Sequence, residues 1–315
     1  MPHPFRFGVQ IHGLPVDSWQ DDVRQLEAMG YDSVFFPDHF GDQWDPTTSL
    51  AAIAGATEKL NVGSLVYDVD YRHPVVFAKA AATLQVMSAG RHIFGIGAGW
   101  METDYVEAGM PYDRPGIRVS RLEEALQIIT SMWENEKTTF EGEHYCVKEI
   151  ARATDLQGQP RPPILIGGGG PRVLRLAGRY ADIVGINPKL VEGKVTKDTP
   201  GDSAPERILE KIGWVREGAE AAGRNPDDIE FNSLSFVTAI MDDPSGLRAR
   251  LAQNSGMTVE QVADCPLFLT GSAQEIRERL EKRREETGIS FLVIQGGDKV
   301  VLENFAKEIV GPLAG

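Results

Sequence analysis

An aspartate and a histidine stand side by side at Asp38 and His39, directly after the apolar run Ser33–Phe36 and Pro37. A β-rich run closed by proline predicts a buried strand that ends there. In parallel α/β proteins, the residues just past the carboxyl ends of the strands face the ligand. A carboxylate and an imidazole at such a point could move a proton near neutral pH. We therefore interpret Asp38 and His39 as candidate catalytic residues, the alternative being a structural pair that braces a loop.

A second candidate site is the four-glycine segment Gly167–Gly170, which joins a predicted strand to a helix that begins near Pro171. Free backbone amides at a helix N-terminus bind phosphate, and Arg172 adds a guanidinium suited to the same anion. No Lys-Ser/Thr pair follows these glycines at the spacing of a P-loop, which argues against a site that hydrolyses nucleoside triphosphates. A tight turn that needs positive φ is the alternative, but four glycines exceed what a turn requires. We assign the anion-binding role to Gly167, Gly168, Gly169, Gly170 and Arg172.

Small residues also close another predicted strand, in the run Gly95–Gly99. They would let a ligand approach the backbone closely, although packing inside a barrel would favour them as well. No metal site is predicted, because Cys146 and Cys265 form no CxxC pair and the acidic and histidine residues show no firm ligand spacing. Weaker candidates at the same predicted edge are Asp68, Asp70, Tyr71, Arg72, His73, Trp100, Glu102, Tyr105, Gly296, Gly297 and Asp298.

Strands and helices alternate along the chain with a spacing of about thirty residues, which is typical of βα units in a parallel sheet. Strands are predicted at Phe5–Ile11, Ser33–Phe36, Asn61–Tyr67, Arg91–Ala98, Pro163–Ile166, Ala181–Ile186, Ile229–Ile240 and Ile289–Gln295. Helices are predicted at Val16–Met29, Ser49–Leu60, Val75–Met87, Arg121–Trp133, Pro171–Arg179, Pro205–Ala222, Ser272–Thr287 and Val300–Val310.

This alternation predicts one α/β domain over residues 1–315, a closed (β/α)8 TIM barrel with insertions near 138–147, 187–205 and 242–269. A doubly wound open sheet is the alternative. It would place a GxGxxG turn after the first strand, where this sequence reads QIHGLP.

Composition and charge exclude several classes of binding partner. The 315 residues are 42% hydrophobic and 25% charged, as in ordinary globular proteins. A net charge of −14 argues against binding to nucleic acid backbones, which requires a basic surface. No signal peptide is visible, and no apolar run approaches the roughly 18–20 residues that cross a bilayer. We therefore expect a cytoplasmic protein with a small-molecule substrate and with neither nucleic acid nor membrane as a partner.

Taken in order, these segments resemble the luciferase-like flavin and deazaflavin oxidoreductases, and most closely the branch that uses coenzyme F420. The resemblance covers nearly the whole chain, and the combination of segments is far more specific than any one of them. The segments that carry it are FRFGVQ, FFPDHF, YRHP, FGIGAGWMETDY, LIGGGGPRVLRLAGRYAD and LTGSAQEIRERL.

The resemblance implies a homodimeric TIM-barrel oxidoreductase in which F420 and a small organic substrate exchange a hydride. His39 would handle the accompanying proton, with Asp38 setting its tautomer. A bulge in the third strand, often with a non-proline cis peptide, would back the ring, and the phosphate tail would lie on Gly167–Gly170 and Arg172. Two alternatives stay open: an FMN-dependent monooxygenase, and a catalytically idle barrel that binds a flavin or a sugar phosphate. The residues expected beside the ring are Ser64, Leu65, Val66, Gly97, Ala98 and Gly99.

Overall fold

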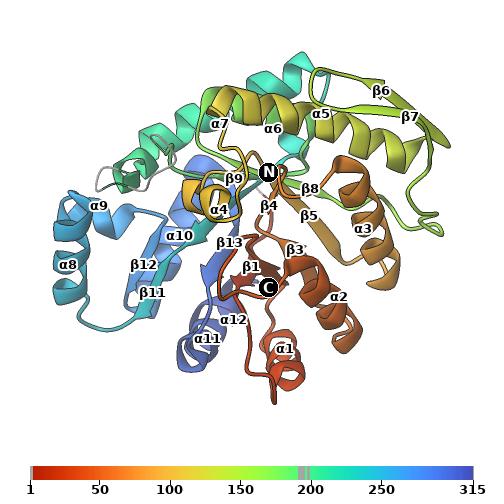
Figure 1. Ribbon diagram of the computed structural model, residues 1–315. Coiled ribbons are helices and arrows are strands. Elements are labelled where there is room, and N and C mark those ends of the chain that lie inside the picture. Colours follow the sequence, from red (N-terminus) through yellow and green to blue (C-terminus); the bar gives the residue numbers. More distant parts are fainter. Residues whose placement is uncertain (1–2, 191–195, 197–198, 315) are drawn as a thin grey trace.

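Parallel strands form a closed ring in the computed structural model, which describes residues 3–190, 196 and 199–314 (Figure 1). The order is β3-β2-β1-β13-β10-β9-β8-β5, and β3 also pairs with β5, which closes the ring. The predicted TIM barrel is confirmed, and the open sheet is excluded. The strands are β1 (Arg6–Gln10), β2 (Ser33–Phe36), β3 (Asn61–Ser64), β4 (Tyr67–Asp68), β5 (His92–Gly97), β8 (Ile164–Gly168), β9 (Ile183–Ile186), β10 (Glu230–Ser235) and β13 (Ile289–Gln295).

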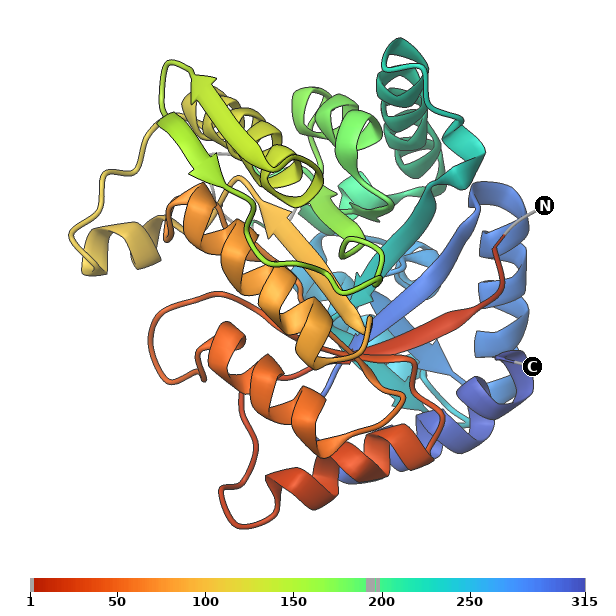
Figure 2. The same ribbon diagram turned by 90° about the vertical axis from the view of Figure 1, so that its right-hand side faces the viewer.

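Helices lie outside this ring and cover the strands (Figure 1, Figure 2). Five of them, α2, α3, α5, α6 and α7, have proline in the first turn, where its missing N–H leaves no intrahelical bond unmade. The helices of the ring are α1 (Trp19–Ala28), α2 (Pro46–Ala56), α3 (Pro74–Met87), α5 (Pro115–Glu134), α6 (Pro171–Tyr180), α7 (Pro205–Ala221), α10 (Ala273–Thr287) and α11 (Lys299–Phe305). The chain continues from α11 through a π-helical turn, Ala306–Val310, and α12 (Gly311–Leu313).

Two of the predicted strands are interrupted. The third ends as β3 at Ser64 and resumes as β4 at Tyr67, so the expected continuous strand over 61–67 is wrong. The seventh ends as β10 at Ser235, and β11 (Val237–Ile240) leaves the barrel to pair with β12 (Phe268–Gly271). Both interruptions occur towards the carboxyl ends of the strands.

The segments predicted as insertions contain secondary structure of their own. An antiparallel hairpin, β6 (Lys137–Glu141) and β7 (Cys146–Ala151), follows α5. The insertion over 242–269 holds α8 (Ser245–Ser255) and α9 (Val259–Asp264). A 3₁₀ helix, Thr199–Ser203, lies in the insertion over 187–205, of which 191–195 and 197–198 fall outside the described residues. A short helix that the sequence did not predict, α4 (Glu102–Glu107), follows β5.

Buried apolar side chains fill both the barrel and the layer between strands and helices. Alternate residues of a strand point to opposite faces, so Ile93 packs inside the barrel, whereas Phe94 packs against the helices. The interior cluster consists of Phe35, Ile93, Leu165, Ile183, Phe291 and Val293. Among the described residues, none of the helices has the length and apolar character needed to cross a membrane.

Candidate active site

The carboxyl ends of neighbouring strands bring the predicted site residues to one edge of the barrel. The backbone amide of Asp68, at the end of β4, donates to the Asp38 carboxylate at 3.1 Å. Asp68 is in register with Gly97 of β5, and Ile96 of β5 is in register with Ile166 of β8. Since all these strands are parallel, their ends face the same way. The edge therefore carries Asp38, His39, Ser64, Leu65, Val66, Gly97, Ala98, Gly99, Gly167, Gly168, Gly169 and Gly170.

His39 is held from α4. Its Nδ1 lies 2.7 Å from Asp104 Oδ2, and the Tyr71 hydroxyl donates to the same oxygen at 3.2 Å. The imidazole also makes an edge contact with the ring of Trp100, 5.5 Å between centroids. Because a carboxylate accepts, Nδ1 carries the hydrogen, and this leaves Nε2 as the nitrogen available to a ligand. The side chain is 19% exposed, so a ligand at the barrel mouth can reach it.

Asp38 does not hold His39, and the prediction that it sets the tautomer of His39 is wrong. Its carboxylate accepts two hydrogen bonds from the Arg72 guanidinium, at 2.6 and 3.1 Å, besides the one from the Asp68 amide. The side chain is only 5% exposed, and a buried carboxylate needs such partners to stay charged. Asp38 thus joins the segments that follow β2 and β4.

A second group of buried acids, Asp68 and Asp70, lies beside Asp38 and Arg72. The Tyr105 hydroxyl is within 2.8 Å of Asp68 Oδ2 and 3.0 Å of Asp70 Oδ2, and Arg121 pairs with Asp70 at 3.0 Å. Burial raises the pKa of Asp68 to about 7, against the Tyr105 and backbone hydrogen bonds that lower it. Gly99, at φ 68°, fits here because a Cβ would lie 2.0 Å from the Tyr105 hydroxyl oxygen. The cluster is compact and depends on a glycine at this position.

The break between β3 and β4 contains a cis peptide bond between Leu65 and Val66, as the resemblance implied. The Gln10 side chain, from β1, donates to the Leu65 carbonyl at 2.7 Å, and the Ser64 hydroxyl donates to the Gly95 carbonyl at 2.6 Å. Gly95 must be small, since a Cβ there would lie 2.0 Å from the Ser64 carbonyl oxygen. The break is therefore fixed by the Gln10 side chain of β1 and by close contact with the backbone of β5 at Gly95.

The glycine segment leads from β8 into α6. None of its four residues has a positive φ, so a turn that demands left-handed glycine is excluded. Packing requires glycine at two of these positions. A Cβ at Gly168 would lie 2.5 Å from Val173 Cγ1, and one at Gly169 would lie 2.6 Å from the Lys189 amide nitrogen. A Cβ added at Gly170, by contrast, would have no described atom within 4 Å apart from those of its chain neighbours. Protein packing therefore does not explain that glycine, and a ligand could lie against it.

Arg172 points to α5 rather than standing free beside the glycine segment. Its guanidinium donates to the Gly116 carbonyl at 2.7 Å and to the Ser120 hydroxyl at 2.8 Å. Both acceptors are uncharged, so the guanidinium could still attract an anion bound at the start of α6.

His73, one of the weaker candidates, caps α3 by accepting from the Val75 amide. Sequence reasoning missed Asp104 altogether. No group of three or more His, Cys, Asp or Glu side chains arranged to hold a metal occurs in the described part of the chain. The candidate site thus consists of an imidazole–carboxylate pair, a backbone break and a glycine segment at one edge of the barrel.

Solved structures share this fold over their full length. An F420-dependent tetrahydromethanopterin reductase from Methanopyrus kandleri superposes with a TM-score of 0.78 at 19% identity, covering 99% of this chain and 100% of that chain. An F420-dependent secondary alcohol dehydrogenase in complex with an F420-acetone adduct gives a TM-score of 0.80 at 20% identity, with coverage of 99% and 100%. At these identities the likeness concerns the fold alone.

Sequence comparison goes further. An F420-dependent glucose-6-phosphate dehydrogenase from Microbacterium testaceum is 37% identical over 241 residues, which make up 73% of this chain and 67% of the relative. The match thus spans about two thirds of the relative's length. The model of the luciferase-like monooxygenase family matches residues 3–287, nearly the whole chain. The chain therefore belongs to the luciferase-like monooxygenase family.

Proposed function

We propose that this protein is a coenzyme F420-dependent oxidoreductase that transfers a hydride between the deazaflavin and a small organic substrate. The observation that supports the proposal is the His39–Asp104 pair, which occupies Nδ1 and leaves Nε2 of a partly exposed imidazole, just past the end of β2, available to a ligand. The name of the relative from Microbacterium testaceum supports the choice of cofactor, and it suggests a substrate with a hydroxyl-bearing carbon.

The residues at the mouth fit a flat ring with a phosphate-bearing tail. The ring would lie against the β3–β4 break, where Val66 packs so closely on Gly97 that a Cβ at that position would come within 2.9 Å of the Val66 side chain. The tail would lie along the start of α6, against Gly170 and its free amides. When bound, the deazaflavin supplies the carbon that gains or loses the hydride. The full proposed set is Ser64, Leu65, Val66, Gly97, Ala98, Gly99, Gly167, Gly168, Gly169, Gly170 and Arg172.

The chain's own residues would move the proton. His39 Nε2 accepts the hydroxyl proton of a substrate whose carbon loses a hydride, and returns it in the reverse direction. Asp104 keeps the hydrogen on Nδ1, so that Nε2 is the basic nitrogen, and the Trp100 contact fixes the plane of the ring. Asp38 acts indirectly, since with Arg72 it fixes the loop that carries His39.

The experiment is a titration of the purified protein with F420 and, separately, with FMN, followed by quenching of cofactor fluorescence. F420 should bind, and reduction of F420 by glucose 6-phosphate and by a panel of small alcohols is then followed by absorbance. His39→Ala should keep the F420 affinity and lose at least roughly 100-fold in turnover, the usual contribution of a positioned acid–base group. His144→Ala, which alters a histidine in the loop between β6 and β7, is the matched control.

The alternatives give different results. Binding of FMN alone, with consumption of oxygen, would favour a monooxygenase. Failure to bind either cofactor would favour the idle barrel, and F420 binding with full turnover in His39→Ala would refute the proposed role of the imidazole.

A further inference from the structure

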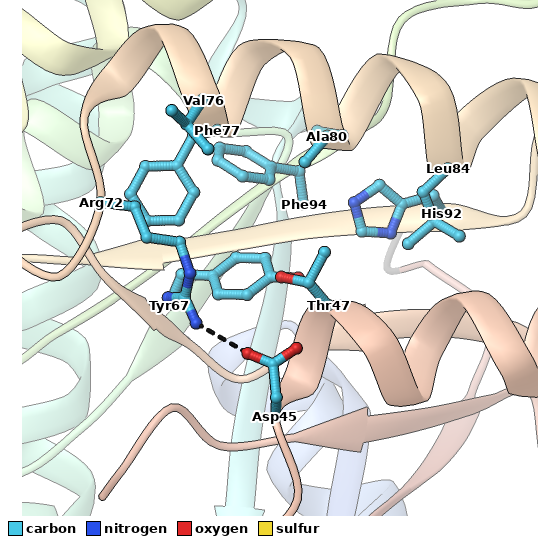
Figure 3. Close-up of a pocket in the computed structure, with 11 residues that line it drawn as sticks. Asp45, Thr47, Tyr67, Arg72, Val76, Phe77, Ala80, Leu84, His92 and Phe94 are labelled. Atoms are coloured by element: carbon cyan, nitrogen blue, oxygen red, sulfur yellow. Dashed lines mark hydrogen bonds and ion pairs between the residues drawn. The ribbon is translucent and has the colours of Figure 1, made fainter.

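A cavity of about 220 Å³ lies between α2 and α3, outside the barrel, and borders the site described above through Arg72 (Figure 3). Its walls come from the inner face of α3, from the start of α2 and from outward-facing side chains of β4 and β5. The rings of Tyr67, Phe77 and Phe94 contact one another, with centroids 5.3 to 6.0 Å apart. The middle of the cavity is therefore apolar and largely aromatic.

One end of the cavity is polar and already satisfied. Arg72 pairs there with Asp45 at 3.1 Å, and Thr47 and Tyr67 share a hydrogen bond of 3.1 Å between their hydroxyl oxygens. Figure 3 shows Arg72 on one side of the Tyr67 ring and His92 on the other, with Thr47 beside the Tyr67 hydroxyl on the side of His92.

The opposite end presents a buried acceptor without a partner. His92 is 1% exposed, and its Nδ1 lies 3.0 Å from the Val62 carbonyl, which can only accept, so Nδ1 carries a hydrogen. Burial lowers the pKa of His92 to about 4, so the ring is neutral near pH 7 and Nε2 carries a lone pair. Among the described residues, nothing hydrogen-bonds to that nitrogen. A buried polar atom left unpaired is costly, and such atoms in native proteins usually find a donor.

The size and chemistry of the cavity define a class of ligand. An engineered apolar cavity of about 150 Å³ takes up benzene, so this larger space can hold a substituted benzene ring. The unpaired acceptor at its end calls for a hydrogen-bond donor. A cation is disfavoured at that end, because Leu84 and Phe94, which lie beside His92 in the cavity wall, are apolar.

We propose that this cavity binds a small neutral alcohol or phenol, whose ring lies among the aromatic side chains and whose hydroxyl donates to His92 Nε2. The proposal is independent of the cofactor and of the chemistry at the barrel mouth.

The test uses two probes of nearly equal size, p-cresol and toluene, titrated calorimetrically into the intact protein. Two variants separate the contributions. His92→Asn removes the Nε2 acceptor, while its side-chain amide can still donate to the Val62 carbonyl. Ala80→Leu fills the cavity from α3 and leaves His92 in place. Thermal unfolding of each variant without ligand checks that the fold is kept.

p-Cresol should bind the wild-type protein, and binding of both probes should be lost in Ala80→Leu. In His92→Asn the ratio of the p-cresol affinity to the toluene affinity should fall roughly two- to tenfold, the value of one neutral hydrogen bond. An unchanged ratio would overturn the assignment of His92, and binding that survives Ala80→Leu would place the probes elsewhere. Failure of p-cresol to bind the wild-type protein would overturn the proposal outright, including the case in which a second copy of the chain covers the opening beside Val76.

Discussion

Replacing Asp68 with asparagine should change how the stability of this protein depends on pH. Asp68 is 7% exposed and accepts hydrogen bonds from the Tyr105 hydroxyl and from the Asp70 amide. Asparagine has nearly the same shape, keeps an acceptor for the Asp70 amide, and can donate to the Tyr105 oxygen. The substitution therefore removes an ionisable group and little else.

Stability should fall as the pH rises, because the folded state raises the pKa of Asp68. The pKa of Asp68 is raised from 3.8 to about 7 in the folded protein, so the folded state holds its proton more tightly than the unfolded state. That contribution to stability is fully present below about pH 4 and is lost as the pH rises through about 7. The pKa of Asp68 is thus about 3 pH units higher in the folded state than in the unfolded state. At about 1.4 kcal/mol per pH unit, this difference is worth roughly 4 kcal/mol of stability.

Asparagine does not titrate, so the variant escapes this loss. The free energy of unfolding of Asp68→Asn minus that of the wild type should rise by roughly 4 kcal/mol between about pH 4 and about pH 8. Urea unfolding followed by tryptophan fluorescence, at several pH values across this range, measures that difference. Asp42→Asn removes the same charge from an exposed loop and controls for the change in net charge. A difference that stays constant within about 1 kcal/mol would refute the argument that burial governs Asp68.

Three further substitutions test the edge of the barrel. Gly95→Ala should lower the free energy of unfolding by about 3 kcal/mol, because its Cβ would meet the Ser64 carbonyl; a loss below about 1 kcal/mol in urea unfolding would contradict this contact. Arg72→Met should cost about 3 kcal/mol, since it leaves the buried Asp38 carboxylate without its counter-ion, and a partial recovery is expected in the double variant with Asp38→Asn. Gly170→Ala should cost less than about 1 kcal/mol but weaken F420 binding about tenfold or more in the fluorescence titration, and an unchanged affinity would remove the phosphate tail from this position.

Element positions followed well from the sequence where an apolar run ends in a strong turn signal. Ser33–Phe36 and Ile289–Gln295 were predicted with the bounds that the structure shows, because proline closes the first and glycines follow the second. The continuous strand predicted over 229–240 failed for a physical reason. Alternating apolar residues indicate an extended chain, but they do not specify the neighbour with which it pairs, and Val237–Ile240 pairs with a strand from the insertion instead of the barrel.

The candidate site can be predicted in part. Placement at strand ends points to His39 and the glycine segment, since that signal is local. The partner of His39 lies 65 residues further along the chain, on a short helix whose sequence carried no clear helical pattern. Only the closed barrel brings α4 over the end of β2, so no local signal could have identified Asp104. Glu102 and Tyr105, on either side of Asp104, are weaker candidates because they follow the fourth predicted strand. Position after a strand therefore indicates a segment rather than a particular residue.

Asp38 and His39 are neighbours in the sequence, but they find partners on different segments of the chain. Both follow the end of β2 and lie outside any strand or helix. Asp38 meets Arg72, whereas His39 meets Asp104. Exchanging Asp38 for asparagine should thus act through the loop and the Arg72 ion pair, while Asp104→Asn acts on the imidazole directly. Only the second should reduce turnover while leaving both the unfolding free energy and F420 binding close to those of the wild type.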